Sequence, residues 1–217
     1  MSSWWSRLFG GTPVPAPVPQ APAPVVPPAA APATVAPTFG ARRPLVGIHG
    51  EVAGFEFRLA PATQQRLQAQ AEGTAAAAHA IALLSAMRST LASGRVALGE
   101  LPASLLGRSS VAEQVPDGAW IAVQGEFASD DSLAGALTSW RTRGVRLGAA
   151  EGSPPPPGAS FVLFRGAEGE LPALLTALDR CAQAQPTHAR VVLDLPGVEA
   201  IEQVLEHGAA LAAGRVE

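Results

Sequence analysis

Eight short apolar runs alternate with amphipathic helical patterns along most of this 217-residue chain, and the alternation limits the fold more than any other feature. The runs, each typical of a β-strand, lie at 45–48, 52–59, 95–98, 119–123, 145–149, 161–164, 190–195 and 209–213. Strands separated by helices usually pair in parallel, and eight of them favour closure of the sheet. The sequence therefore predicts an α/β fold with a TIM-barrel-like sheet.

The first two strand-like runs are joined differently from the others. Only His49, Gly50 and Glu51 separate them, whereas a parallel crossover needs about a dozen residues or more. These two runs are therefore predicted to form an antiparallel hairpin that opens the barrel.

Apolar residues at helical spacing predict four helices between the later strands. The apolar residues, grouped by predicted helix, are Leu84, Met87 and Leu91; Leu133, Leu137 and Trp140; Leu171, Leu174, Leu175 and Leu178; and Ile201, Val204 and Leu205. Ser129 and Asp130 are candidate N-caps of the second helix, and Gly208 is expected to end the fourth.

Residues 12–41 have the composition of a linker. Ten prolines lie between residues 12 and 38, among Ala, Val and Thr and without any charged residue. Such a segment favours extended polyproline II and buries no core. The folded domain is therefore expected at 42–217.

Residues 1–11, MSSWWSRLFGG, contain two of the four tryptophans of the chain. If this segment is helical, one face carries Trp4, Trp5, Leu8 and Phe9. The segment has neither the apolar length nor the cleavage site of a secretory signal. We expect it to dock on a protein or to contact a membrane surface through these four residues. The alternative is an unstructured start with incidental aromatic residues.

Composition excludes several classes of protein. The net charge is −3, and charges of both signs are interspersed, so no basic stripe indicates a nucleic-acid partner. The single cysteine, Cys181, forms no internal disulfide, and no segment is expected to approach the roughly 18 apolar residues of a membrane span. The expected location is cytoplasmic, with residues 1–11 as a possible means of membrane association.

No metal ligand or nucleophile stands out among the residues that usually serve these roles. The four histidines, which are His49, His79, His188 and His207, lie in unrelated elements and show no metal-ligand spacing. Cys181 falls on an amphipathic helix, so we expect a half-buried packing residue there and not a nucleophile. The sequence predicts no catalytic residue, no metal and no cofactor.

The opening block of the predicted domain reads RRPLVGIHGEVAGFEFRL at 42–59. It resembles the hairpin of the EAL domain, the cyclic di-GMP phosphodiesterase family, in which the second strand reads G-[YF]-E-[AL]-L. The later blocks are RVALGELPASLLG, WIAVQGEFASDDSLAGALTSWRTRGVRLGAAEG, SFVLFRG, ARVVLDLPGVEAIEQVLEHG and ALAAGRV. They resemble the F-V-N-L-S-P, L-E-I-T-E, V-K-I-D, A-E-x-V-E and Q-G-Y regions of the family. The resemblance implies an EAL-type barrel and a role in cyclic di-GMP signalling.

The resemblance also implies that most groups of the family's two-metal site are replaced. Glu56 matches the first metal-binding glutamate and is the vestige of that site, while Glu151 and Asp194 are the other acids at metal positions. The remaining positions are matched by Ala60, Gly99, Gln124, Ala150, Leu163, Arg165, Gly197 and Ala213. Because the chain contains no lysine, the family's assisting lysine, which matches Leu163, is absent in any register.

Two helices of the family have no counterpart. Between the fifth and sixth strands, only GSPPPPGA joins Glu151 to Ser160, and four consecutive prolines cannot form a helix there. The family's final helix is also missing after the eighth strand. The resemblance therefore implies a reduced barrel whose outer face beside Pro154–Pro157 is exposed, apolar and used for self-association or a partner.

We expect a catalytically inactive EAL-like signalling protein that acts through contacts with an unidentified protein partner, and not an enzyme. A homo-oligomer is one form such contacts could take. One alternative is a receptor that binds cyclic di-GMP without hydrolysing it, with Arg58 or Arg165 in place of the family's arginine at Ala60. A second alternative is an active phosphodiesterase, against which the absence of lysine counts.

Overall fold

The computed structural model describes residues 39–60, 63, 73–125 and 131–214. The segment 1–11 that is expected to dock, most of the expected linker and the candidate caps Ser129 and Asp130 lie outside these residues.

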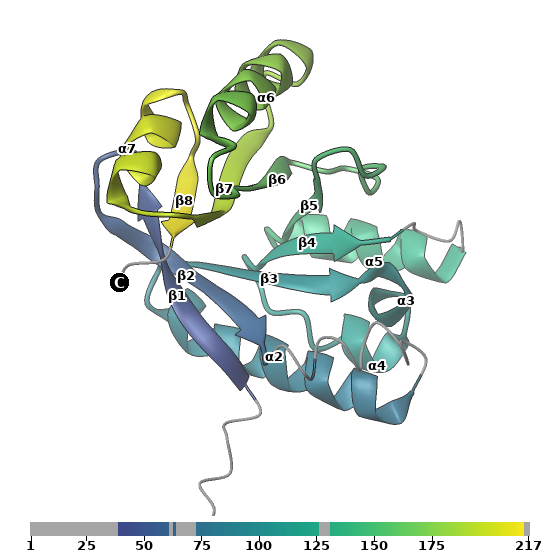
Figure 1. The fold of residues 1–217 in the computed structure, drawn as a ribbon. Coiled ribbons are helices and arrows are strands. Elements are labelled where there is room, and N and C mark those ends of the chain that lie inside the picture. The colour runs from purple at the N-terminus through teal and green to yellow at the C-terminus, as the bar shows by residue number, and fades with distance from the viewer. Residues whose placement is uncertain (1–38, 61–62, 64–72, 126–130, 215–217) are drawn as a thin grey trace, which may run out of the picture. The chain divides into compact units, whose positions relative to one another are not determined.

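Eight strands close into a barrel, and each strand pairs with its neighbours in chain order (Figure 1). They are β1 (Phe39–Gly47), β2 (Val52–Leu59), β3 (Val96–Pro102), β4 (Trp120–Gln124), β5 (Arg146–Ala150), β6 (Phe161–Arg165), β7 (Ala189–Leu195) and β8 (Leu211–Gly214). All eight predicted strands are confirmed, and so is the TIM-barrel-like fold.

The opening hairpin is also confirmed. β1 runs antiparallel to β2 on one side and to β8 on the other, whereas every other neighbouring pair is parallel. The amide of Gly47 donates to the carbonyl of Glu51 at 2.9 Å and closes the turn. Gly50 adopts a φ of 76° in this turn, a conformation that a residue without Cβ reaches with little strain.

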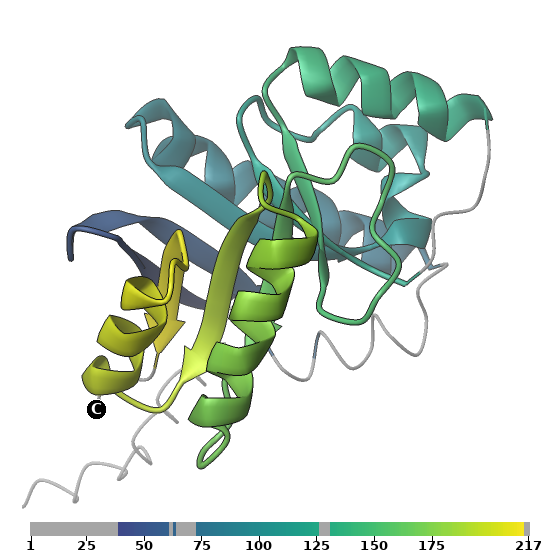
Figure 2. The same cartoon turned by 90° about the horizontal axis from the view of Figure 1, so that it is seen from above.

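Helices surround the barrel on its outer side (Figures 1 and 2). They are α2 (Thr74–Ala92), α3 (Ala103–Leu106), α4 (Ser109–Ala112), α5 (Asp131–Thr142), α6 (Leu171–Ala184) and α7 (Val198–Glu206). The four predicted helical patterns fall on α2, α5, α6 and α7. Gly208 follows α7 with a φ of 84°, as expected for a glycine that ends a helix.

Helix α2 corrects one expectation. It has 19 residues and is long and apolar enough to cross a membrane, if only length and composition are considered. In the structure, however, Leu83, Leu84 and Met87 of this helix are buried in the core on the outer side of β2 and β3. This packing is typical of a core helix of an α/β barrel.

No helix covers the connection from β5 to β6, as the four prolines predict. Residues 151–160 form turns, in which the amide of Ser153 donates to Ala150 and that of Ala159 donates to Pro156. Pro156 is buried, while its proline neighbours are exposed. Figure 2 shows this connection as a long loop beside the sheet.

Two kinds of core hold the barrel together. The interior is filled by Leu45, Leu98, Ala122, Phe161, Leu163, Val191, Leu193, Leu211 and Ala213. Phe161 lies 5.3 Å from Trp120, centroid to centroid, and a Cβ on Gly148 would come within 2.4 Å of the Phe161 ring. A side chain at residue 148 is therefore excluded because Phe161 occupies the space. Two further apolar layers join the outer strand faces to the helices.

Candidate functional site

The parallel strands place polar side chains at one end of the barrel. Side chains alternate along a strand, so Glu100 faces the same way as the interior residue Leu98, and Arg165 the same way as Leu163. In barrels of this architecture, functional side chains sit at the C-terminal ends of the strands. The polar side chains that meet there are Arg43, Glu56, Arg58, Glu100, Gln124, Arg165 and Asp194, which we term the mouth network.

Glu56 is the most buried member of the mouth network, with 1% of its side chain exposed. Arg43 donates from Nε to Oε2 at 2.7 Å, and Arg58 donates from Nε to Oε1 at 2.6 Å. Two guanidinium groups therefore occupy the two carboxylate oxygens. A buried carboxylate without such partners would be strongly destabilising.

Asp194 reaches the mouth network because β7 is irregular. Its φ is 63°, and the pairing of β7 with β8 shifts register between Val192 and Leu195. Leu193 lies in the barrel interior, whereas Leu195 packs in the outer layer with α6 and α7. The extra residue of this bulge thus changes the alternation and directs Asp194 into the mouth.

Three arginines converge on Asp194. Arg43 Nη1 donates to Oδ1 at 2.9 Å, and Arg58 Nη2 contacts Oδ1 at 2.7 Å and Oδ2 at 2.8 Å. Arg165 Nη1 donates to Oδ2. Burial opposes ionisation of Asp194, but hydrogen bonds from Arg58 and Arg165 and the nearby positive charges outweigh it and lower its pKa from 3.8 to about 2.

Glu100 extends the network across the barrel. Arg165 on β6 donates from Nη2 to Glu100 Oε1 on β3, and Gln124 on β4 donates from Nε2 to Oε2 at 2.9 Å. Burial lowers the pKa of the Arg165 guanidinium, yet Glu100 and Asp194 together raise it above its ordinary value. Arg165 is therefore a charged link between β3 and β7.

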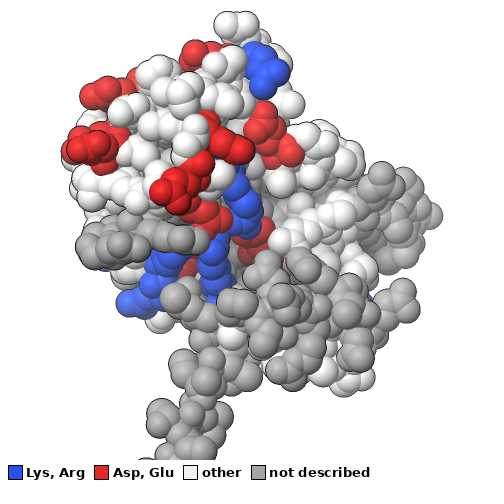
Figure 3. Space-filling view, viewed as in Figure 1, with Lys and Arg blue, Asp and Glu red and all other residues white. Residues whose placement is uncertain are grey.

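The charges of the mouth network balance, since three guanidinium groups face three carboxylates. Figure 3 shows blue and red side chains gathered side by side near the middle of this face. Each carboxylate accepts hydrogen bonds from at least one arginine. A hard divalent cation would therefore have to compete with these guanidinium donors for the carboxylate oxygens.

These residues do not fit the two-metal site that the resemblance attributes to the EAL family. Metal binding would require Glu56 to release two arginines, and it would place a divalent cation beside three positive charges. Within the described residues, no group of three His, Cys, Asp or Glu side chains is arranged to hold a metal ion.

The structure corrects the assignment of Gly99 to the family's asparagine position. A Cβ on Gly99 would meet Met87 Sδ at 3.3 Å and Leu83 Cδ2 at 3.4 Å, both in α2. Gly99 therefore faces the outer layer, and the inward position at this level of β3 belongs to Glu100. Because side chains alternate along a strand, the inward direction of Glu100 follows from that of Leu98, and this pattern could have identified Glu100 from the sequence.

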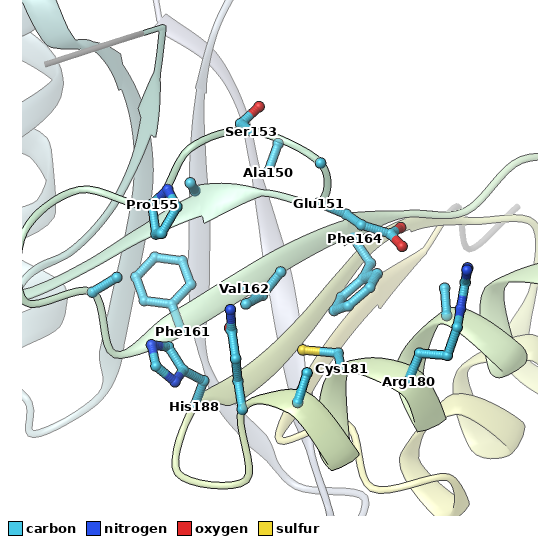
Figure 4. A pocket seen from close by; sticks show the side chains of 16 residues that line it. Ala150, Glu151, Ser153, Pro155, Phe161, Val162, Phe164, Arg180, Cys181 and His188 are labelled. Atoms are coloured by element: carbon cyan, nitrogen blue, oxygen red, sulfur yellow. The ribbon is translucent and has the colours of Figure 1, made fainter.

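Glu151 is another correction, because it does not join the mouth network. It follows β5 in an exposed turn and lines a hollow on the outer side of β5 and β6 together with Val162 and Phe164 (Figure 4). Of the acids that the resemblance placed at metal positions, the structure brings together Glu56 and Asp194. Sequence reasoning missed the roles of Arg43 and Glu100.

The other positions that the resemblance singled out are spread over several environments. Leu163 and Ala213 are buried in the barrel interior, and Gly197 precedes the first turn of α7. Cys181 is half-buried, as predicted; burial raises the pKa of its thiol, and the charge of Glu151 adds to this effect despite Arg190. A thiol with a raised pKa is not activated as a nucleophile.

The outer face beside Pro154–Pro157 differs from the expected exposed apolar surface. The large exposed apolar side chains in the described part of the chain are Ile48, Val52 and Val198, and none belongs to β5, β6 or their connection. In place of an exposed apolar patch, this face has a hollow that is bordered by the proline loop and by α6. Its use in self-association stays a prediction.

Similarity to solved structures supports the EAL-type fold. An EAL domain protein from Listeria monocytogenes shares 12% identity and a TM-score of 0.56, over 80% of this chain and 84% of that chain. The phosphodiesterase PaMucR in complex with c-di-GMP shares 15% identity and a TM-score of 0.57, over 80% and 92%. The EAL domain of DcpA from Mycobacterium smegmatis shares 18% identity and a TM-score of 0.52, over 80% and 88%.

At sequence identities this low, the structural similarity establishes a shared fold alone. No protein-family model matches the sequence, and no curated protein matches it. The domain is therefore an eight-stranded EAL-type barrel with its own set of side chains at the mouth.

Proposed function

We propose that this protein is a catalytically inactive EAL-like regulator that acts through protein contacts. The observation that carries the proposal is the pairing of Glu56 with Arg43 and Arg58. In a metal-dependent phosphodiesterase, carboxylates at the mouth must hold cations that orient and acidify water. Here arginines neutralise the same groups, and the chain contains no lysine to assist.

The mouth network instead favours a structural role. It links β1, β2, β3, β4, β6 and β7 through side chains at the end of the barrel. A rigid barrel can present outer surfaces to a partner without any chemistry at its mouth. The segment 1–11, with Trp4, Trp5, Leu8 and Phe9, is proposed as a second contact with a protein or a membrane surface.

A second candidate is a receptor that binds cyclic di-GMP without hydrolysis. The observation in its favour is that Arg58 and Arg165 remain partly exposed, with 31% and 40% of their side chains accessible. Guanidinium groups bind phosphate well. The phosphates of the ligand would have to compete with Glu56, Glu100 and Asp194, which counts against this candidate.

Two measurements on the full chain test both candidates. The first is incubation with cyclic di-GMP and magnesium or manganese, followed by chromatography for the linear dinucleotide. We expect no product above a buffer blank, and product that Glu56→Ala abolishes would overturn the proposal. The second is titration calorimetry with cyclic di-GMP, with and without magnesium. Saturable binding without product would favour the receptor.

A further inference from the structure

The hollow on the outer side of β5 and β6 has the size and lining of a small-molecule site. Its volume is about 330 Å³, at the lower end of the range of roughly 300–1,000 Å³ for ligand pockets. It lies where a helix is missing between α5 and α6, and the loop 152–159 borders it. Small metabolites, and not large cofactors, match this volume.

The body of the hollow is apolar. Val162 and Phe164 line it from β6 (Figure 4), and Ala177 and Ala184 line it from α6. The ring of Phe161, at the start of β6, packs in the barrel interior. An apolar or aromatic group placed in the hollow would leave water and contact the apolar side chains of β6 and α6.

The rim of the hollow carries two exposed charges of opposite sign. Glu151 and Arg180 both line the hollow, and Figure 4 shows them toward one end of it. Neither carboxylate nor guanidinium forms an ion pair within the described residues. Opposite charges that line one hollow without pairing complement a ligand that carries both an ammonium and a carboxylate.

The other end of the hollow carries His188. Its Nδ1 is buried and has no hydrogen-bond partner among the residues that the structure describes. Figure 4 shows His188 near Phe161, away from Arg180. A buried polar atom without a partner costs about 1–3 kcal/mol, so a ligand that supplies a hydrogen bond here would gain affinity.

We infer that this hollow binds a free α-amino acid with an aromatic side chain. The ring enters the apolar body beside Phe164, the carboxylate binds Arg180, and the ammonium binds Glu151. A ring N–H donates to His188 Nδ1 when the imidazole proton is on Nε2. The site is on the outer side of the sheet, so it functions whether or not the barrel mouth binds cyclic di-GMP.

L-Tryptophan is the probe, because its indole N–H matches the unpartnered nitrogen of His188. Titration calorimetry with the full chain is expected to give a dissociation constant of about 1 mM or tighter. Tryptamine, which lacks the carboxylate, and indole-3-propionate, which lacks the ammonium, are each expected to bind about tenfold more weakly, since each loses one charged contact.

Cys181 gives an independent readout. It lines the hollow and is the single cysteine of the chain, so alkylation by iodoacetamide reports on this place alone. Saturating L-tryptophan is expected to slow alkylation several-fold.

Three variants make the test specific. Arg180→Gln and Glu151→Gln, both at exposed residues, are each expected to weaken L-tryptophan about tenfold. Ala184→Trp should fill the hollow and abolish both binding and protection. Asp179→Asn is the matched control, because it removes an exposed charge from α6 that does not line the hollow.

The melting temperature of each variant confirms that it is folded. Absence of binding to the folded wild type at about 10 mM L-tryptophan would overturn the inference. So would binding that Arg180→Gln, Glu151→Gln and Ala184→Trp leave unchanged.

Discussion

Glu56 and Arg43 face each other directly across the opening hairpin, paired residue to residue in the β1–β2 register, with Arg43 Nε 2.7 Å from Glu56 Oε2. The hairpin that distinguishes this barrel therefore also supplies a counter-ion for the carboxylate at its mouth. Arg58, two residues after Glu56 on the same strand, supplies the second.

Glu56→Gln is expected to lower the free energy of unfolding by about 2–4 kcal/mol. The amide removes the anion and leaves Arg43 and Arg58 without one of their buried partners, which is more destabilising than losing an exposed ion pair. Urea unfolding at neutral pH measures the change. Glu202→Gln on the exposed face of α7 is the control and should stay within about 0.5 kcal/mol of wild type. A similar small loss for Glu56→Gln would show that the buried pairing contributes little.

Acid is expected to destabilise the domain through Asp194. Its folded pKa of about 2 lies below its ordinary value of 3.8, so the unfolded chain binds the proton first as the pH falls. The stabilisation is complete above about pH 4 and is lost as the pH falls toward 2. The loss is about 1–2 kcal/mol after allowing for solvent screening of this partly exposed side chain.

Comparison with Asp194→Asn isolates this contribution, because the amide does not titrate. The difference in unfolding free energy between wild type and variant should shrink between about pH 4 and pH 2. A difference that is constant over this range would contradict the assignment.

Gly148→Ala is expected to destabilise the barrel by about 1–3 kcal/mol, because its Cβ would come within 2.4 Å of the Phe161 ring. Gly135→Ala is the matched control. It lies inside α5 with nothing within 4 Å of the added Cβ, so alanine there should stabilise the protein by about 0.5–1 kcal/mol. Thermal unfolding of both variants measures the two changes in stability, which are expected to have opposite signs. Equal effects would mean that Phe161 moves aside at little cost.

Deletion of residues 1–11 is expected to leave the melting temperature of the domain nearly unchanged while dispersing a fluorescent fusion in cells. The reason is that a proline-rich linker separates this segment from the barrel, so its contacts are with a target. The double change of Trp4→Ala and Trp5→Ala should reproduce the dispersal. Arg7→Ala should have the larger effect if anionic lipid is the target. Unfolding of the domain on deletion would show that the segment belongs to its core.

Much of the fold was accessible from the sequence, because it depends on local patterns. Period-two and helical spacing of apolar residues predicted the eight strands of the barrel and the helices α2, α5, α6 and α7. The three-residue connection after Ile48 required a hairpin, and Pro154–Pro157 excluded a helix before β6. The absence of lysine is likewise a property of the sequence alone.

The partners of the charged residues were decided by the tertiary structure. Arg43 and Asp194 are 151 residues apart in the chain, and barrel closure brings them to 2.9 Å. The direction of Asp194 depends on a left-handed backbone conformation at a bulge, which strand alternation does not encode. Residue matching placed Glu56 and Asp194 at a metal site, but only packing in three dimensions showed that arginines bind them. Ion pairs form between groups that the fold brings together, so the sequence determined which charges are present and the barrel determined how they pair.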